Sequence, residues 1–187
     1  MTDPTARVLA LLSLLLSAHA RGAAKAGVTL PDSVTAAGKT LTLNGIGIRE
    51  ATVMNIDVYA AGLYLETKSP DPAAILDSSQ VKRLELVFVR DVDREDIVEA
   101  WKDGFKKNGA DMTAFAPRIG TLNAWMSDIK EKDSLVFLIE PGKGLTVTVR
   151  GRVKGNIPGD DFSKAFLTIW LGPSPPNKGL KAGLLGK

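Results

Sequence analysis

The residues with the clearest chemical potential lie in the segment LNGIGIRE, residues 43–50. Gly45 and Gly47 occupy alternate positions, and Arg49 follows them in the same alternation. Glycines at alternate positions of a strand remove side chains from one face, so that a ligand or a neighbouring backbone can approach closely. We therefore expect the Arg49 side chain to point to the face that the glycines leave open. A tight turn with a solvated arginine is the alternative.

A guanidinium beside an open groove suits a carboxylate or enolate oxygen, because its planar donors pair with both oxygens at once. The next extended segment adds a polar cluster, since Asn55, Asp57 and Tyr59 alternate along it. A buried tyrosine normally finds a hydrogen-bond partner, and a buried aspartate needs a cation. If this face meets Arg49, the cluster forms the polar end of an apolar pocket. If it faces solvent, it has no such role.

The N-terminal residues predict export. Arg7 is followed by an apolar run at 8–16 and by small residues that end at Ala20, which is the pattern of a secretory signal peptide. The run is about half of the roughly 20 residues that a membrane-spanning helix needs, so we expect no membrane span. We expect residues 1–20 to be cleaved and residues 21–187 to form a single periplasmic or secreted domain. A buried N-terminal helix is the alternative.

Cleavage there would remove the only histidine, His19, and the chain contains no cysteine. This excludes Cys/His metal sites, disulfides, an imidazole base and Ser-His-Asp or Cys-His nucleophiles from the mature chain. No dense carboxylate cluster of the calcium-loop type appears. We therefore expect no metal and no organic cofactor. The formal charge is only +3, and Lys and Arg are scattered among Asp and Glu instead of forming a basic stripe. This argues against a nucleic acid partner.

Hydrophobic periodicity predicts an α+β domain, with an antiparallel sheet and helices packed on one of its faces. Asp93 is the expected N-cap of the first long helix, with Asp96 in the capping-box position. The tail at 173–187 carries apolar residues for one amphipathic turn, which either docks on the body or stays free. The predicted strands span 28–30, 39–44, 52–66, 83–90, 134–140, 145–150 and 153–157, and the predicted helices span 94–107, 115–129 and 160–171.

Three separated segments, in this order, resemble chalcone-isomerase-like proteins. They are LNGIGIRE followed by VYAAGLYLE at 58–66, then AFLTIWLG at 165–172, and finally the pair Leu180-Lys181. The resemblance covers about residues 39–186. It implies an open-faced β-sandwich, in which a large antiparallel sheet packs against a layer of helices with a cleft between them.

The plant enzymes of this family hold the ketone of a chalcone with an arginine, helped by further polar residues. Arg49 matches the arginine. The resemblance places Tyr59 and Ile169 at the positions of two threonines, Ile97 near that of a tyrosine and Gly104 near that of an asparagine. Only the arginine of the polar set is therefore retained, and each missing acid or base removes roughly 10²–10⁴-fold of rate.

The segment VYAAGLYLE is more similar to the fatty-acid-binding members, in which an arginine and a tyrosine hold the ligand's carboxylate. The resemblance therefore implies a non-catalytic protein that binds a fatty acid or similar apolar carboxylate. A weak intramolecular lyase or isomerase that uses Arg49 on an enone, and a partner-binding subunit with a vestigial cleft, are the alternatives. The expected ligand-binding residues are Arg49, Tyr59, Asp57, Gly45, Gly47, Leu63 and Ile169.

Overall fold

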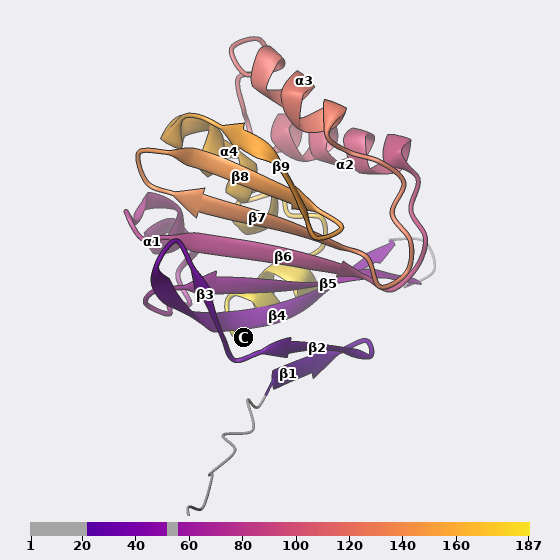
Figure 1. Cartoon of the computed structure of the whole chain (residues 1–187), viewed down its shortest axis with the longest axis vertical. Helices are drawn as coiled ribbons and strands as arrows, with labels where there is room; N and C mark the ends of the chain where they lie inside the picture. Colours follow the sequence, from indigo (N-terminus) through magenta and orange to yellow (C-terminus); the bar gives the residue numbers. More distant parts are fainter. Residues whose placement is uncertain (1–21, 52–55) are drawn as a thin grey trace, which may run out of the picture.

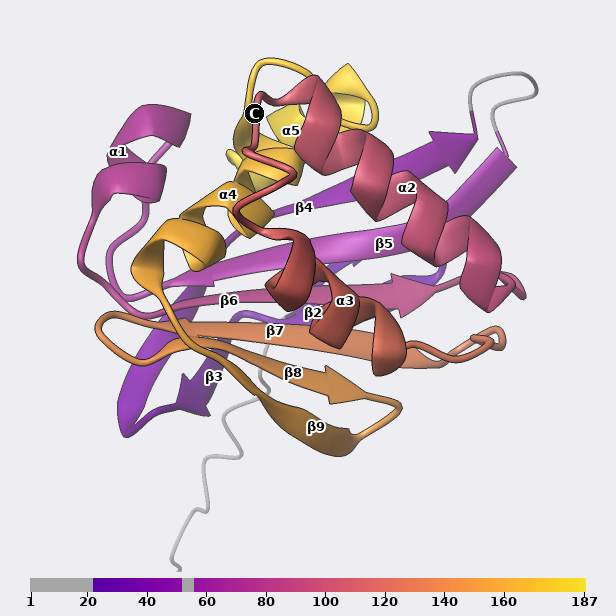
Figure 2. The same cartoon turned by 90° about the horizontal axis from the view of Figure 1, so that it is seen from above.

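The computed structural model describes residues 22–51 and 56–187. It consists of one antiparallel sheet with helices on one face and a small hairpin on the other (Figures 1 and 2). The strands are β1 (Gly22–Lys25), β2 (Val28–Pro31), β3 (Ser33–Ala36), β4 (Lys39–Ala51), β5 (Ile56–Leu65), β6 (Lys82–Phe88), β7 (Ser134–Glu140), β8 (Gly144–Val149) and β9 (Arg152–Ile157). The helices are α1 (Pro72–Asp77), α2 (Arg94–Lys107), α3 (Ala116–Ala124), α4 (Asp160–Leu171) and α5 (Lys178–Leu184).

The main sheet has seven strands in the order β3-β4-β5-β6-β7-β8-β9, and each pair of neighbours is antiparallel. The strands therefore lie side by side in the order in which they follow one another along the chain. The helices α2 and α3 are inserted between β6 and β7, and α4 follows β9. Figure 2 shows α2, α3 and α4 in front of the sheet, on the same side. This arrangement confirms the predicted α+β class.

Strand β6 shows why the sheet forms with a buried face. Its sequence KRLELVF alternates strictly between buried and partly exposed positions, with Leu84, Leu86 and Phe88 toward the helices. The helices meet this face with apolar stripes of their own, for example Ile97, Trp101 and Phe105 of α2. Burying a large apolar side chain contributes about 1.5–3 kcal/mol, so matching stripes on sheet and helices stabilise the layered arrangement.

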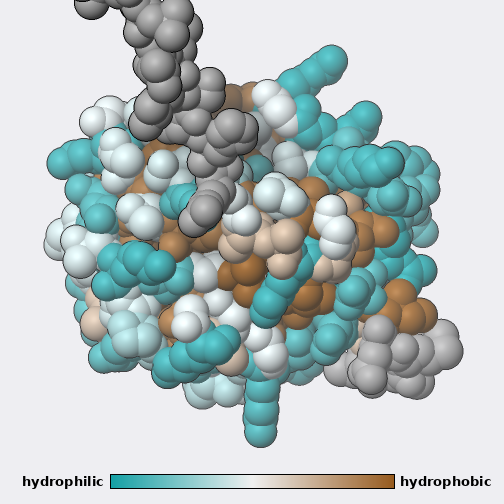
Figure 3. All heavy atoms as spheres, turned by 90° about the horizontal axis from the view of Figure 1, so that it is seen from below, coloured by the Kyte–Doolittle hydropathy of each residue, from teal (hydrophilic) through white to brown (hydrophobic). Residues whose placement is uncertain are grey.

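The opposite face of the sheet holds a second, smaller core. Leu30 of the β1–β2 hairpin packs there with Leu41, Ile46 and Tyr64. Figure 3 views the molecule from this side and shows hydrophobic atoms near the middle of the face. Partly buried apolar residues surround this core, namely Ala23, Val28, Val34, Ala36, Ile48, Val87 and Leu138.

The structure adds elements that periodicity does not reveal. The hairpin strand β1, the edge strand β3 and the short helix α1 were not predicted, and the strand predicted at 39–44 continues to Ala51. The helix predicted at 115–129 ends at Ala124, and Ile129 instead forms a β-bridge with Val92.

Asp93 is the N-cap of α2, as predicted, but its side chain makes no capping hydrogen bond. The Asp128 carboxylate instead accepts a hydrogen bond from the Arg94 amide.

The C-terminal tail docks on the body. Leu180 and Leu184 of α5 are completely buried, and α5 packs on β4 and β5. None of the helices in the described residues is long and apolar enough to cross a membrane. The predicted signal peptide and residues 52–55 lie outside the described residues.

Candidate functional site

A cavity of about 690 Å³ lies between the sheet and the helices α2 and α4. This volume is within the range of about 300–1,000 Å³ that is typical of small-molecule sites. Strands β4, β5 and β6 form its floor, and the segment between α4 and α5 closes one side. The lining residues are Arg49, Ala51, Val58, Tyr59, Leu86, Phe88, Arg90, Asp91, Val92, Asp93, Asp96, Ile97, Ala100, Trp101, Asp103, Gly104, Lys107, Ile169, Trp170, Ser174, Pro175 and Pro176.

Arg49 and Tyr59 form the polar end of this cavity. They are direct cross-strand partners in the β4–β5 register, and both line the cavity. Directly opposed residues on one face have their Cβ atoms about 4.5–5.5 Å apart, so the two side chains leave the sheet together. The alternation of Gly45, Gly47 and Arg49 thus predicts the correct face for the arginine.

The Tyr59 hydroxyl is buried and already has one partner. Its oxygen accepts a hydrogen bond of 3.0 Å from the indole nitrogen of Trp170 on α4. Burial raises the pKa of Tyr59 to about 12, although the Trp170 bond and the charge of Arg49 favour ionisation. Because the oxygen already accepts a bond, the hydroxyl proton remains for a second one, and no acceptor in the described residues takes it. Tyr59 is therefore a neutral hydrogen-bond donor toward the cavity.

Arg49 has no carboxylate partner in the described part of the chain. Its guanidinium donates to the main-chain oxygen of Glu50, which uses only one of its five donors. At the mouth of the cavity, Asp91 is paired with Lys130 at 2.9 Å and Asp103 with Lys107 at 3.0 Å. Asp93 and Asp96 also line the cavity, but no carboxylate of the described residues forms an ion pair with Arg49.

Apolar side chains of both layers form part of the cavity wall. Phe88 on β6, Ile97 and Trp101 on α2, and Ile169 on α4 are each at most 5% exposed and line its walls. Gly104 of α2 allows α4 to approach, since a Cβ atom at this position would lie 2.6 Å from the Ile169 side chain. The polar end formed by Arg49 and Tyr59 thus opens into a cavity with apolar walls and charged side chains at its mouth.

The segment between α4 and α5 is fixed as one wall. Ser174 exchanges two hydrogen bonds of 3.0 Å with the Asn108 side chain at the end of α2. Lys181 donates to the main-chain oxygen of Gly172 at 2.8 Å, and the Asn177 side chain donates to that of Ile48 at 3.0 Å. These bonds connect the segment to α2, to the end of α4 and to the strand that carries Arg49.

The glycines Gly45 and Gly47 do not border the cavity, contrary to the predicted site. The backbone of α5 occupies the face that they leave open: added Cβ atoms would lie 2.1 Å from the Gly183 oxygen and 2.3 Å from the Leu180 oxygen, respectively. Of the two occupants that the glycine pattern allows, a neighbouring backbone is the one observed.

Asp57 and Leu63 are also absent from the lining. Leu63 is completely buried in the core of the sheet. For Asp57 the cause is a β-bulge, because Arg49 pairs with Tyr59 while Glu50 pairs with Asp57, which leaves Val58 as the extra residue. The bulge breaks the alternation that the sequence suggested, and Val58 lines the cavity together with Tyr59.

Of the seven predicted residues, Arg49, Tyr59 and Ile169 line the cavity. The predicted cluster partner Asn55 lies outside the described residues.

Sequence reasoning missed the role of Trp170. The predicted helix at 160–171 includes this residue, but nothing in the local pattern indicates that its indole would reach Tyr59. The missed signal is chemical, because a buried indole and a buried phenol each require a hydrogen-bond partner. Arg90, an exposed cation at the cavity mouth, was also missed. The described residues contain no group of His, Cys, Asp and Glu arranged to hold a metal ion.

An antiparallel meander with helices on one face and a cavity between the two layers defines an α+β protein of the open-faced sandwich type. The chain belongs to the chalcone isomerase-like family, whose model matches residues 22–186. No curated protein matches it in sequence. Among solved structures, it is similar to a fatty-acid binding protein of Arabidopsis thaliana, with a TM-score of 0.68, 19% identity, and coverage of 85% of this chain and 92% of that one.

Proposed function

We propose that this chain is a non-catalytic binding protein that holds a fatty acid or a similar apolar carboxylate in the cavity of about 690 Å³. The observation that carries the proposal is the pair of Arg49 and Tyr59, a cation beside a hydroxyl, for which residues 22–51 and 56–187 provide neither a carboxylate partner nor an acceptor of the hydroxyl proton. We also propose that the chain is exported and that its N-terminal residues 1–20 are removed.

The polar end suits a carboxylate in charge and in hydrogen bonding. A buried or half-buried charge without a partner carries an uncompensated desolvation cost, which a ligand carboxylate at Arg49 would offset. Tyr59 would donate to one of the ligand's oxygens. Trp170 already donates to the Tyr59 oxygen, so the hydroxyl proton is what Tyr59 offers to a ligand. The site therefore favours hydrogen-bond acceptors with negative charge.

Two observations support binding over turnover. Three cavity positions that the family resemblance assigns to polar residues of the plant enzymes are occupied by Ile97, Gly104 and Ile169, which can neither donate nor accept a proton. Catalysis of the cyclisation would depend on Arg49 and on a tyrosine whose raised pKa makes it a poor base at neutral pH. The Arabidopsis structure with the same fold is that of a fatty-acid binding protein, which supports the same proposal.

Isothermal titration calorimetry with a series of saturated fatty acids tests the proposal. We expect Arg49→Ala to weaken binding by about 2–5 kcal/mol, the usual cost of deleting one partner of a buried charge pair. Arg152→Ala, on the exposed edge strand β9, is the matched control and should bind as the wild type does. Thermal melts without ligand should show little loss of stability in either variant. Undiminished binding by Arg49→Ala would refute the proposed site.

Mass spectrometry of the natively purified, then denatured protein provides an independent test. We expect a co-purifying fatty acid or related carboxylate in the wild type and much less of it in Arg49→Ala. Turnover of a chalcone panel that depends on Arg49 would instead favour the intramolecular lyase. A protein partner that is retained by Arg49→Ala, without any bound lipid, would favour the partner-binding subunit.

A further inference from the structure

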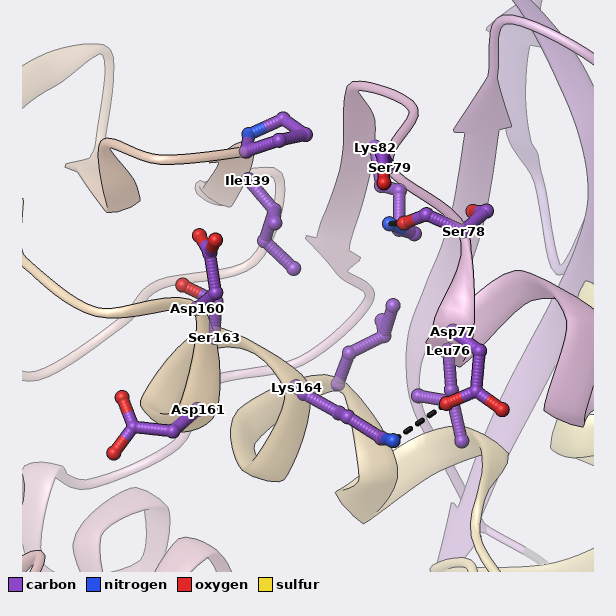
Figure 4. A pocket seen from close by; sticks show the side chains of 12 residues that line it. Leu76, Asp77, Ser78, Ser79, Lys82, Ile139, Asp160, Asp161, Ser163 and Lys164 are labelled. Atoms are coloured by element: carbon purple, nitrogen blue, oxygen red, sulfur yellow. Dashed lines mark hydrogen bonds and ion pairs between the residues drawn. The ribbon is translucent and has the colours of Figure 1, made fainter.

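A second cavity of about 290 Å³ lies on the other side of α4, and it shares no lining residue with the cavity that contains Arg49. It is bounded by the first turns of α4, by the link between α1 and β6 and by the turn between β7 and β8 (Figure 4). Its apolar surface comes mainly from Leu76, Ile139 and Leu167. Five charged side chains also line it.

Three of these five charges are neutralised by neighbours. Asp77 forms an ion pair with Lys164, which Figure 4 shows as a dashed line. Asp161 is held by two parallel bonds of 2.7 and 2.8 Å from Arg118. Lys82 and Asp160 remain, and neither has an ion-pair partner among the described residues. One ammonium and one carboxylate are thus available to a ligand.

Lys82 is buried because it continues the alternation of the buried residues in β6. Its residue exposure is only 5%. The ammonium donates to the main-chain oxygens of Ser78 at 2.6 Å and Gln80 at 3.2 Å. Lysine has three donors, and the described residues provide no acceptor for the third. Burial lowers the pKa of Lys82, while the charges of Asp160 and Glu66 oppose this shift.

Asp160 lies on the opposite side of the cavity. It is the first residue of α4, and its two carboxylate oxygens accept from the Gly142 amide at 2.9 and 3.1 Å. These contacts orient the carboxylate and leave free lone pairs on both oxygens. In Figure 4, Asp160 and Lys82 lie on different sides of the cavity, and the Ile139 side chain points between them.

We infer that this cavity binds a small zwitterion, namely a free amino acid with an apolar side chain. The ligand's carboxylate would accept the third proton of Lys82, and its ammonium group would donate to Asp160. Its side chain would pack against Ile139 and Leu167, which are 6% and 1% exposed. The volume of about 290 Å³ is at the lower limit for small-molecule sites, which favours a single amino acid over a peptide.

Ligands that lack one of the two charges test this inference. By calorimetry, we expect leucine to bind at least tenfold more tightly than leucinamide, which lacks the carboxylate, and isocaproate, which lacks the amine. Isocaproate is also a short fatty acid, so its titration uses the Arg49→Ala variant, in which the larger cavity has lost its cation. Equal affinities for the three compounds, or no leucine binding at millimolar concentration, would overturn the inference.

Two variants locate the leucine site. Asp160→Asn retains an oxygen for the Gly142 amide but loses the charge, and we expect at least a tenfold loss of leucine affinity. Lys82→Met replaces the buried ammonium by an apolar side chain of similar length, with the same expected loss. Lys102→Met, on the exposed side of α2, is the matched control and should bind leucine normally.

Leucine binding that persists unchanged in Asp160→Asn would overturn the inference even if Lys82→Met does not fold. Fatty-acid binding should be unaffected by both variants. A failure of the zwitterion site can therefore be distinguished from a failure of the fatty-acid site.

Discussion

The indole nitrogen of Trp170 donates a hydrogen bond of 3.0 Å to the Tyr59 hydroxyl across 111 residues of sequence. The bond joins α4 to β5 at the polar end of the larger cavity. It also determines the hydrogen-bonding character of the site, because it occupies the oxygen of Tyr59 and leaves the proton for the ligand.

Replacing either partner should therefore have different effects on binding and on stability. Tyr59→Phe removes one hydrogen bond to a charged ligand, and we expect fatty-acid affinity to fall by about 1.5–3 kcal/mol. Calorimetry checks this value. An unchanged affinity would mean that the Tyr59 proton does not reach the ligand.

Trp170→Phe removes the orienting donor and also shrinks a side chain that is packed in the core. The Tyr59 oxygen then loses its partner in a buried environment, which costs about 1–3 kcal/mol of folding stability. We expect a lowered melting temperature without ligand and a smaller loss of affinity than in Tyr59→Phe. A larger affinity loss than that of Tyr59→Phe would show that Trp170 contacts the ligand itself.

Both tyrosines of the chain should resist ionisation. Burial raises the pKa of Tyr59 and of Tyr64 to about 12 each, from an ordinary value of 10.0. A tyrosine that ionises less readily in the folded state stabilises the fold fully below pH 10, and this contribution is lost as the pH rises from 10 through 12. For Tyr59 the loss amounts to about 3 kcal/mol.

Tyrosinate absorbance near 295 nm, followed together with circular dichroism, measures this titration. We expect little ionisation at pH 10 and a rise that coincides with alkaline unfolding. Tyr59→Phe should make stability less sensitive to pH between 10 and 12. Full ionisation of either tyrosine at pH 10, with the fold intact, would contradict the expected pKa values.

The close approach of α5 to β4 predicts a sensitive glycine. Gly47→Ala would place a Cβ atom 2.3 Å from the Leu180 main-chain oxygen, so α5 must move. Overpacking of this kind costs about 1–3 kcal/mol. Gly120→Ala is the matched control, because nothing lies within 4 Å of its added Cβ atom in α3. Alanine should even stabilise that helix by up to about 1 kcal/mol.

Chemical denaturation of Gly47→Ala and Gly120→Ala measures the change in unfolding free energy that each substitution causes. An unchanged stability in Gly47→Ala would mean that α5 shifts without cost. In that case the segment at 174–176, which lines the cavity and leads into α5, would be a less rigid wall than its hydrogen bonds indicate.

Export is tested by intact mass on protein from its native host. The small residues that end at Ala20, after a short apolar run, predict a mature chain that begins near Arg21. Recovery of the full-length chain from the cytosol would contradict the proposed cleavage. Replacing Ala18 and Ala20 by bulky residues should block cleavage and increase the recovered mass to that of the full chain.

Local patterns in the sequence predicted much of the layered fold. Helix α2 has the predicted bounds Arg94–Lys107, and the terminal helix has the predicted bounds Asp160–Leu171. Amphipathic periodicity marks these elements because one face of each must be buried. The short elements β3 and α1 were missed, because a few residues carry too little periodicity to be distinguished from a loop.

The sequence by itself also determined that Arg49 lies on the face of β4 that its glycines leave free of side chains, because alternation is a local property of a strand. Only the tertiary structure decided what fills that face: α5 covers Gly45 and Gly47, and the cavity begins at Arg49. The bulge that separates Asp57 from Tyr59, the bond from Trp170 and the burial of Lys82 also depend on contacts between distant segments. Periodicity records which face of an element is buried, but not which distant side chain will meet it there.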